Sequence, residues 1–290
     1  MSTVLFVGPG LMGGPMIANL VRAGHRVRAI GRSETSRRRA VDAGAELRDH
    51  LSAAVDCDVV ITMLPDTPDV EAAVFGAGGL ASVMPSGRIF IDMSTIVPAA
   101  AKRIAEAFAE RDVAALDCPV SGGEQGAIDG TLTVMAGGEA EALERARPVL
   151  EAMSSRITHV GPAGSGQMTK AANQIIVAAN IQAVAEAVVL LESAGVDLEA
   201  ALSALGGGFA GSAVMEAKRK AWLHDDFTPG FRTELHNKDM RIVAAAVQEN
   251  RLALPLNALV TQLLVAVEAR GYGKLDDSAL LKLTRELNGD

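Results

Sequence analysis

Short apolar runs alternate with amphipathic stretches along the first half of the chain. The runs occupy residues 4–7, 27–30, 59–64, 89–92, 113–117, 132–136 and 157–160 and predict strands. The stretches between them predict helices. Because such alternation is typical of parallel strands joined by crossover helices, we predict a doubly wound α/β sheet for residues 1–163.

The apolar spacing changes to that of helices after residue 161. Helical periodicity covers residues 168–191, 198–205, 240–247, 254–267 and 278–287. We therefore predict an all-helical domain at residues 164–290, joined to the first by a long helix. That helix is apolar on more than one face, so a homo-oligomer, dimer or tetramer, built through the helical domain is expected.

A glycine-rich turn follows the first predicted strand. It contains Gly8, Gly10, Leu11, Met12 and Gly13 and leads into a predicted helix. With a second strand within about thirty residues, this is the context of a dinucleotide fingerprint. The glycines would bring backbone amides and the helix N-terminus against a pyrophosphate. The alternative is a glycine-rich turn without a ligand.

The end of the second predicted strand bears on the choice of cofactor. An acidic residue there would hydrogen-bond the ribose of NAD, but the chain has Arg32 and Ser33. Arg32 can pair with a 2′-phosphate through two hydrogen bonds, so NADP is the predicted cofactor and NAD the alternative. Glu34 is the competing feature, because its carboxylate would repel that phosphate if it turned inward.

Polar and glycine-rich residues follow three further predicted strands. They are Met63, Leu64 and Pro65, then Thr95, then Ser121, Gly122 and Gly123. Any one of these groups is consistent with an ordinary βα turn. Since ligands collect at the carboxyl ends of parallel strands, the groups together predict a site, with the first four residues facing the cofactor. A serine hydroxyl plus glycine amides suits a bound carboxylate.

One face of the long helix carries a cation and two amides. Lys170, Asn173 and Gln174 stand at i, i+3 and i+4 among small and apolar neighbours. A lysine at the edge of a partly dry environment can act as an acid near neutral pH, because desolvation lowers the pKa of an ammonium group. The alternative is a solvent-facing lysine on a surface helix.

Composition narrows the class of protein. Hydrophobic residues make up 49% of the 290, enough for two cores, and the net charge of -8 without a basic stripe argues against nucleic acid as a partner. Two cysteines and five scattered histidines show no metal-ligand spacing. No signal peptide or membrane span is expected, since Asn180, Gln182 and Glu186 interrupt the most apolar helix. A reducing cytoplasm fits the cysteine usage.

Four ordered motifs resemble those of the β-hydroxyacid dehydrogenase family, nearly end to end. They are the glycine turn at 8–16, residues 117–123, residues 164–174, and the pair Lys238 and Asp239. Cys118 and Gln174 stand where Ala and Asn are commoner in the family. The resemblance implies a Rossmann-type domain, an all-α domain and a site in the cleft between them. It also implies an NAD(P)-dependent oxidoreductase acting on the CH–OH group of 3-hydroxy acids.

The resemblance also implies roles for individual residues. Lys170 would protonate the substrate oxygen as hydride arrives from the nicotinamide, and would act as the base in reverse. Asn173 and Gln174 would fix substrate oxygens, and residues 121–123 would hold the substrate carboxylate. Lys238 would approach the nicotinamide, its alternative being a surface Lys-Asp pair at a helix start. For Gln174 the alternative is an amide that braces the cofactor or the backbone.

The resemblance implies a small-molecule substrate, a short carboxylate semialdehyde or 3-hydroxy acid. Residues 121–133, 171–180, 207–212 and 227–239 are most similar to family members that reduce 2-hydroxy-3-oxopropionate (tartronate semialdehyde) to glycerate. Oxidation of 3-hydroxyisobutyrate is the alternative. Two other classes remain: a non-catalytic NAD(P)-binding module, expected to have lost Lys170 or the Ser121 motif, and an imine reductase, which generally lacks this lysine.

Overall fold

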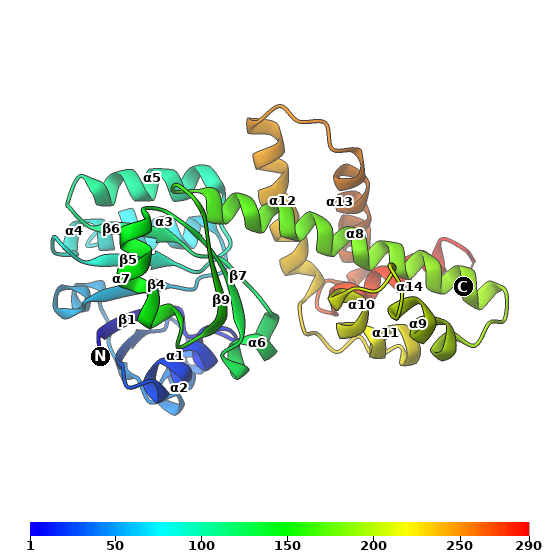
Figure 1. Cartoon of the computed structure of the whole chain (residues 1–290), viewed down its shortest axis with the longest axis horizontal. Coiled ribbons are helices and arrows are strands. Elements are labelled where there is room, and N and C mark those ends of the chain that lie inside the picture. Colours follow the sequence, from blue (N-terminus) through cyan, green and yellow to red (C-terminus); the bar gives the residue numbers. More distant parts are fainter. Residues whose placement is uncertain (290) are drawn as a thin grey trace. The chain divides into compact units, whose positions relative to one another are not determined.

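A nine-stranded sheet organises the first part of the chain (Figure 1). The structure, a computed structural model, describes residues 1–289. The strands are β1 (Thr3–Val7), β2 (Arg26–Ile30), β3 (Glu46–Leu47), β4 (Val59–Thr62), β5 (Ile89–Asp92), β6 (Ala114–Asp117), β7 (Val120–Ser121), β8 (Leu132–Gly137) and β9 (Ser154–Gly161). They lie in the order β3-β2-β1-β4-β5-β6-β8-β7, with β9 paired to β8.

The six strands from β3 to β6 are all parallel, which confirms the predicted doubly wound sheet. The expectation that every strand is parallel is wrong for β8 and β9, which run against the other strands. Strand β8 runs antiparallel to both β6 and β7, and β9 is parallel to β8. The connection from β6 to β8 contains β7 and a helix of only seven residues, so it does not form the full crossover that parallel pairing requires.

Helices cover both faces of this sheet. They are α1 (Gly13–Arg22), α2 (Glu34–Asp42), α3 (Thr67–Phe75), α4 (Leu80–Val83), α5 (Pro98–Ala109), α6 (Gly123–Asp129) and α7 (Ala140–Leu150), with a 3₁₀ turn η1 at Leu51–Asp56. Strand β1 shows why both faces are covered. Val4 and Phe6 enter one apolar cluster, while Leu5 and Val7 enter another. Because neighbours on a strand point to opposite faces, a run without polar residues requires two cores.

The second part of the chain is all-helical, as predicted. Its elements are α8 (Ser165–Ser193), α9 (Leu198–Gly206), α10 (Ala213–Ala217), α11 (Arg219–His224), α12 (Thr233–Glu249), α13 (Pro255–Val267), η2 (Glu268–Tyr272), η3 (Asp277–Ala279) and α14 (Leu280–Glu286). Its core includes Trp222, Met240, Leu264 and Leu280. The short α10 and α11 were not predicted from the sequence.

Helix α12 begins at Thr233, well before the predicted start at Met240. The expected start was wrong because it relied on apolar periodicity. The first turns of α12 bury polar residues, among them His236 and Asn237. Buried polar groups require hydrogen-bond partners, and those partners lie on other elements that the local sequence does not reveal.

Helix α8 is long and apolar enough to cross a membrane, with a mean hydropathy of 1.8 in its most apolar window. This corrects the expectation that no segment of the chain is long and apolar enough to span a membrane. Its residues Ala178, Ile181 and Ala185 belong to the core of the helical unit. The amide of Gln182 donates to Glu186 and Thr284. About a third of the same window, 33%, is buried inside the structure.

The chain divides into a unit of residues 1–170 and a second unit that begins at Ala171. The sequence placed this division after residue 163. The later division has a structural cause, because the first turn of α8 is bonded to the sheet of the first unit. Backbone amides of Gly164 and Gln167 donate to the carboxylate of Asp117 at 2.8 Å each. The functions assigned to the two domains stay predictions.

Candidate active site

The glycine turn between β1 and α1 is tightly packed at two glycines and open at the third. A Cβ on Gly13 would lie 2.2 Å from the Gly8 carbonyl oxygen, and Gly8 itself has φ +103°. By contrast, apart from Gly10 and its two chain neighbours, no heavy atom of the described residues lies within 4 Å of a Cβ built on Gly10. Gly8 and Gly13 therefore shape the turn, while the space over Gly10 admits a close ligand.

The start of α1 supports an anion in that space. Met12 precedes the helix, and within the described chain no side chain caps the first turn. Leu11 is exposed beside it. Uncapped amides at a helix N-terminus favour a negatively charged group, so the turn fits the pyrophosphate of a dinucleotide.

The loop after β4 contacts the glycine turn. A Cβ on Gly8 would lie 2.2 Å from the Met63 carbonyl oxygen, and the amide of Leu64 donates to Ser94 Oγ at 2.9 Å. Pro65 is exposed and Thr95 half-buried, both directly after these contacts. The structure thus brings together the carboxyl ends of β1, β4 and β5, as the sequence predicted.

Arg32 and Ser33 stand at the end of β2, but both have protein partners. Arg32 is exposed, with 78% of its side chain accessible, and donates to Asp69 Oδ1 at 2.8 Å. Ser33 caps α2 by accepting from the Ser36 amide. An exposed ion pair contributes less than about 1 kcal/mol, so the Arg32 guanidinium remains exchangeable toward a phosphate. The roles of both residues toward a cofactor stay predictions.

The segment after β7 exposes backbone amides. Gly122 has φ +133° and Gly123 has φ +62°, values that favour glycine. Both glycines are exposed, and Ser121 before them is half-buried. A hydroxyl followed by two accessible amides is a fitting receptor for a carboxylate.

Lys170 lies next to this segment. Its Nζ donates to the carbonyl oxygen of Val120 at 2.8 Å, one residue before Ser121. The side chain is 8% exposed, so the alternative of a solvent-facing lysine is wrong. An amine and an exposed glycine turn, 50 positions apart in sequence, therefore meet in the first unit.

The carboxylate of Asp117 was not among the predicted site residues. Its Oδ1 accepts from the Gly164 amide and its Oδ2 from the Gln167 amide, both at 2.8 Å. Hydrogen bonds to a charged group contribute about 1.5–3 kcal/mol each. The only signal in the sequence was its place in the motif at 117–123, since the partners lie 47 and 50 positions away.

A second hydrogen-bonded chain lies in the helical unit. Asn173 Nδ2 donates to Gln174 Oε1 at 2.8 Å, and Gln174 Nε2 donates to Asp239 Oδ2 at 2.7 Å. Lys238 Nζ lies 2.7 Å from Asp239 Oδ1. Lys238 and Asp239 are only 8% and 3% exposed, so the alternative of a surface Lys-Asp pair is wrong. Gln174 braces Asp239, and its predicted contact with substrate remains untested.

A buried polar cluster surrounds His236, two residues before Lys238. His236 Nδ1 lies 2.8 Å from Asp277 Oδ2, and Lys218 Nζ lies 2.7 Å from Asp277 Oδ1. Burial alone would raise the pKa of Asp277, but the hydrogen bonds and charges of His236 and Lys218 hold that pKa below its usual value. No sequence motif predicts this cluster, because its members are far apart along the chain.

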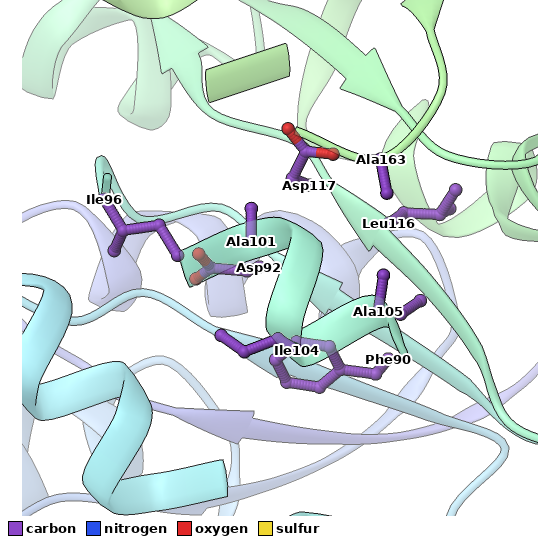
Figure 2. A pocket seen from close by; sticks show the side chains of 10 residues that line it. Phe90, Asp92, Ile96, Ala101, Ile104, Ala105, Leu116, Asp117 and Ala163 are labelled. Carbon is purple, nitrogen blue, oxygen red and sulfur yellow. The ribbon is translucent and has the colours of Figure 1, made fainter. Parts of the chain in front are cut away.

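Asp92 is a buried carboxyl at the end of β5. Figure 2 shows it with Asp117 among the residues that line a small pocket. Its Oδ1 accepts from Thr62 Oγ1 at 2.8 Å and from the Ser94 amide at 3.1 Å. Burial raises the pKa of Asp92 to about 6, because these hydrogen bonds do not offset the loss of water.

Two protein families match this chain. The family described as the NAD binding domain of 6-phosphogluconate dehydrogenase matches residues 3–161. The family described as NAD-binding of NADP-dependent 3-hydroxyisobutyrate dehydrogenase matches residues 164–284. The two matches cover nearly the whole chain in the order of the two units.

Individual relatives align over almost their full length. The 2-hydroxy-3-oxopropionate reductase of Escherichia coli strain K12 is 40% identical over 96% of this chain and 95% of its own. The 3-hydroxyisobutyrate dehydrogenase of Pseudomonas aeruginosa is 37% identical over 98% and 99%. A solved structure of Mycobacterium tuberculosis 3-hydroxyisobutyrate dehydrogenase with L-serine has a TM-score of 0.88 at 34% identity, covering 98% and 99% of the two chains.

The raised pKa of Asp92 predicts how stability depends on pH. A carboxyl that binds its proton more tightly when folded stabilises the fold below its unfolded pKa of 3.8, and this contribution is lost as pH rises to about 6. Relative to Asp92→Asn, which keeps the acceptor oxygen, wild type should lose on the order of 2–3 kcal/mol of unfolding free energy between pH 4 and pH 7. Urea denaturation of both proteins across that range measures the difference. A difference independent of pH would contradict the prediction.

Proposed function

The chain belongs to the β-hydroxyacid dehydrogenase family of NAD(P)-dependent oxidoreductases, and we propose that it reduces 2-hydroxy-3-oxopropionate to glycerate. The observation that carries this proposal is the 2.8 Å contact of Lys170 Nζ with Val120, beside the exposed amides of Gly122 and Gly123. A buried proton donor next to a carboxylate receptor is what a short acidic semialdehyde requires. Oxidation of 3-hydroxyisobutyrate is the second candidate. It is favoured by the similarity of this chain to the 3-hydroxyisobutyrate dehydrogenase of Pseudomonas aeruginosa.

The proposed chemistry divides between the cofactor and the chain. The bound nicotinamide supplies the hydride that reduces the aldehyde carbon. Ser121 and the amides of residues 122–123 hold the substrate carboxylate and so orient the aldehyde. Lys170 donates a proton to the aldehyde oxygen as negative charge develops there, and takes the proton back in the oxidative direction.

Residues of the glycine turn and strand ends hold the dinucleotide in this proposal. Gly8, Gly10 and Gly13, with Leu11 and Met12, would bind the pyrophosphate, supported by the open space over Gly10. The remaining proposed cofactor residues are Arg32, Ser33, Met63, Leu64, Pro65, Thr95 and Lys238. The roles of Asn173 and Gln174 toward the substrate, and of Lys238 toward the nicotinamide, still rest on the sequence motifs alone.

Replacing Lys170 by Ala should lower turnover strongly while sparing the fold and cofactor binding. A positioned acid or base typically supplies about 10²- to 10⁴-fold in rate, so kcat should fall by that factor. Cofactor fluorescence should give an unchanged Kd. Ethylamine in the assay should restore part of the lost rate, because a free amine can enter the space the side chain leaves.

Lys102→Ala is a matched control, since it removes a lysine near Gly164 that has no proposed part in the chemistry. It should retain the turnover of wild type, with or without ethylamine. If Lys170→Ala turns over as fast as wild type, Lys170 is not the proton donor and the proposed mechanism fails.

The cofactor should be NADP(H) in preference to NAD(H). In the described chain, the exposed Arg32 follows β2 and no carboxylate occupies positions 31–33. Arg32→Ala should raise the KM for NADPH about tenfold or more and leave the KM for NADH nearly unchanged, because only NADPH carries the phosphate. Asp69→Asn is the companion variant: it frees Arg32 from its ion pair and should tighten NADPH binding. Equal or better use of NADH by wild type would refute this preference.

Glycerate should be a better substrate than 3-hydroxyisobutyrate in the oxidative direction. The two differ at the middle carbon, and a pocket that hydrogen-bonds a hydroxyl can reject the methyl analogue by about 10⁴-fold. Because the amide of Gln174 is engaged with Asn173 and Asp239, this order rests on the similarity to the reductase. Comparing kcat/KM with the preferred cofactor decides the order. An advantage for 3-hydroxyisobutyrate would reverse it and leave the mechanism intact.

We also propose that the chain forms a homo-oligomer through its helical unit and works in the cytoplasm. Large apolar side chains are exposed there, including Ile176 and Leu190 on α8 at 65% and 71%, and Leu256 and Leu259 on α13 at 56% and 58%. Exposure on this scale suggests contact with another copy. Light scattering should give a dimeric or tetrameric mass, and Ile176→Glu should lower it. A monomeric mass for wild type at assay concentration would exclude the oligomer.

The competing classes are addressed by the same assays. A non-catalytic NAD(P)-binding module would lack Lys170 or the Ser121 motif, and both are present. An imine reductase would act on imines and not on semialdehydes. Adding one imine to the substrate panel separates these activities.

A further inference from the structure

Two motifs that are separate in the sequence meet at one carboxylate. Asp117 ends β6 and opens the segment that contains Val120 and Ser121. Its two oxygens accept the amides of Gly164 and Gln167 at the start of α8. Asp117 is only 5% exposed, so these bonds are largely shielded from water. Its carboxylate is directed at the helix start that leads to Lys170.

Glycine allows this approach. A Cβ on Gly166 would lie 2.3 Å from the Asp117 carbonyl oxygen and 2.4 Å from that of Met135. A Cβ on Gly137 would lie 2.4 Å from Asp117 Oδ1. Any larger residue at either position would push the helix start away from the carboxylate. The contact is therefore built from both sides, by glycines on α8 and on β8.

The side chain of Gln167 is a second anchor for the same turn. Its Oε1 accepts from the Ile96 amide at 3.0 Å, and its Nε2 donates to the Ser94 carbonyl at 2.8 Å. Gln167 is 1% exposed. The first turn of α8 is thus bonded to the residues that follow β5 as well as to the end of β6. Rotation or sliding of this turn would break four hydrogen bonds.

Lys170 follows Gln167 by three residues, nearly one helical turn. Its Nζ reaches back to the Val120 carbonyl, three residues after Asp117. The amine is therefore tied to the 117–123 segment at two points, through the helix start and through its own hydrogen bond. A displacement of the turn would carry the amine with it.

We propose that Asp117 and Gln167 are positioning residues, which fix where the amine of Lys170 lies relative to the substrate by holding the first turn of α8. The inference rests on the proposed role of Lys170 as proton donor. Neither side chain need touch the substrate. They act through the helix, and a misplacement of about 1 Å at a reacting group is enough to cost about 10²-fold in rate.

The test compares Asp117→Asn with Asp58→Asn. Asp58 is a matched control, because its carboxylate also accepts a backbone amide, that of Thr3 at 2.9 Å, but at the amino ends of β1 and β4. Asp117→Asn keeps the size of the side chain and places an amide NH₂ against one backbone donor. We expect kcat per cofactor-binding site to fall about 10- to 100-fold, while the KM for substrate and the Kd for NADPH change less than threefold. Asp58→Asn should keep the kcat of wild type.

Gln167→Ala provides a second measurement if Asp117→Asn does not fold. It removes two of the four hydrogen bonds that hold the first turn of α8. As for Asp117→Asn, we expect a lower kcat with a nearly unchanged KM. Unchanged kcat in the folded variants would overturn the inference. So would a loss of NADPH affinity in proportion to kcat, which indicates a general collapse of the sheet edge.

The Lys170→Ala variant separates failure of this inference from failure of the proposed function. If Lys170→Ala loses turnover while Asp117→Asn and Gln167→Ala keep it, the proton donor stands and the positioning role is refuted. If Lys170→Ala keeps full turnover, the proposed function and the inference fall together. Loss of kcat in all three variants, with Asp58→Asn unaffected, is the result we expect.

Discussion

The structure depends on the bonds between the Asp117 carboxylate and the first turn of α8. That helix is 29 residues long and belongs to both units of the chain. The backbone amides at its N-terminus carry partial positive charge, so they stabilise a buried carboxylate. The carboxylate in turn accepts hydrogen bonds from amides that have no partner within the helix. Burial raises the pKa of Asp117, while these backbone hydrogen bonds lower it. One carboxylate thereby joins the sheet to the helix that carries Lys170.

Close backbone approach is the second constraint on the site. The turn at Gly8 and Gly13, the loop after β4 and the start of α8 all come within distances that a Cβ would block. The backbone is open at two other glycines, Gly10 and Gly123, where a ligand is expected. Glycine therefore serves two purposes in this site: it allows close packing at some positions and leaves room for a ligand at others.

The helical unit uses buried polar side chains in place of backbone contacts. Gln174 donates a hydrogen bond to Asp239, which pairs with Lys238. His236, also on α12, pairs with Asp277, which pairs in turn with Lys218. A buried charge is costly unless it is paired, so each such group fixes the position of its partner. These buried ion pairs and hydrogen bonds, and not apolar periodicity, therefore specify where α12 begins.

The parallel sheet, the all-helical second part and the glycine turn could be predicted from the sequence, because strand and helix periods and short motifs are visible along the chain. The oxidoreductase family was predicted from the resemblance of four motifs to a known family. Tertiary structure alone decided that β8 is antiparallel, that α12 begins at Thr233, that Arg32 pairs with Asp69, and that Asp117 holds α8. Each of these depends on partners many positions apart, and hydrogen bonds between distant residues leave no period in the sequence.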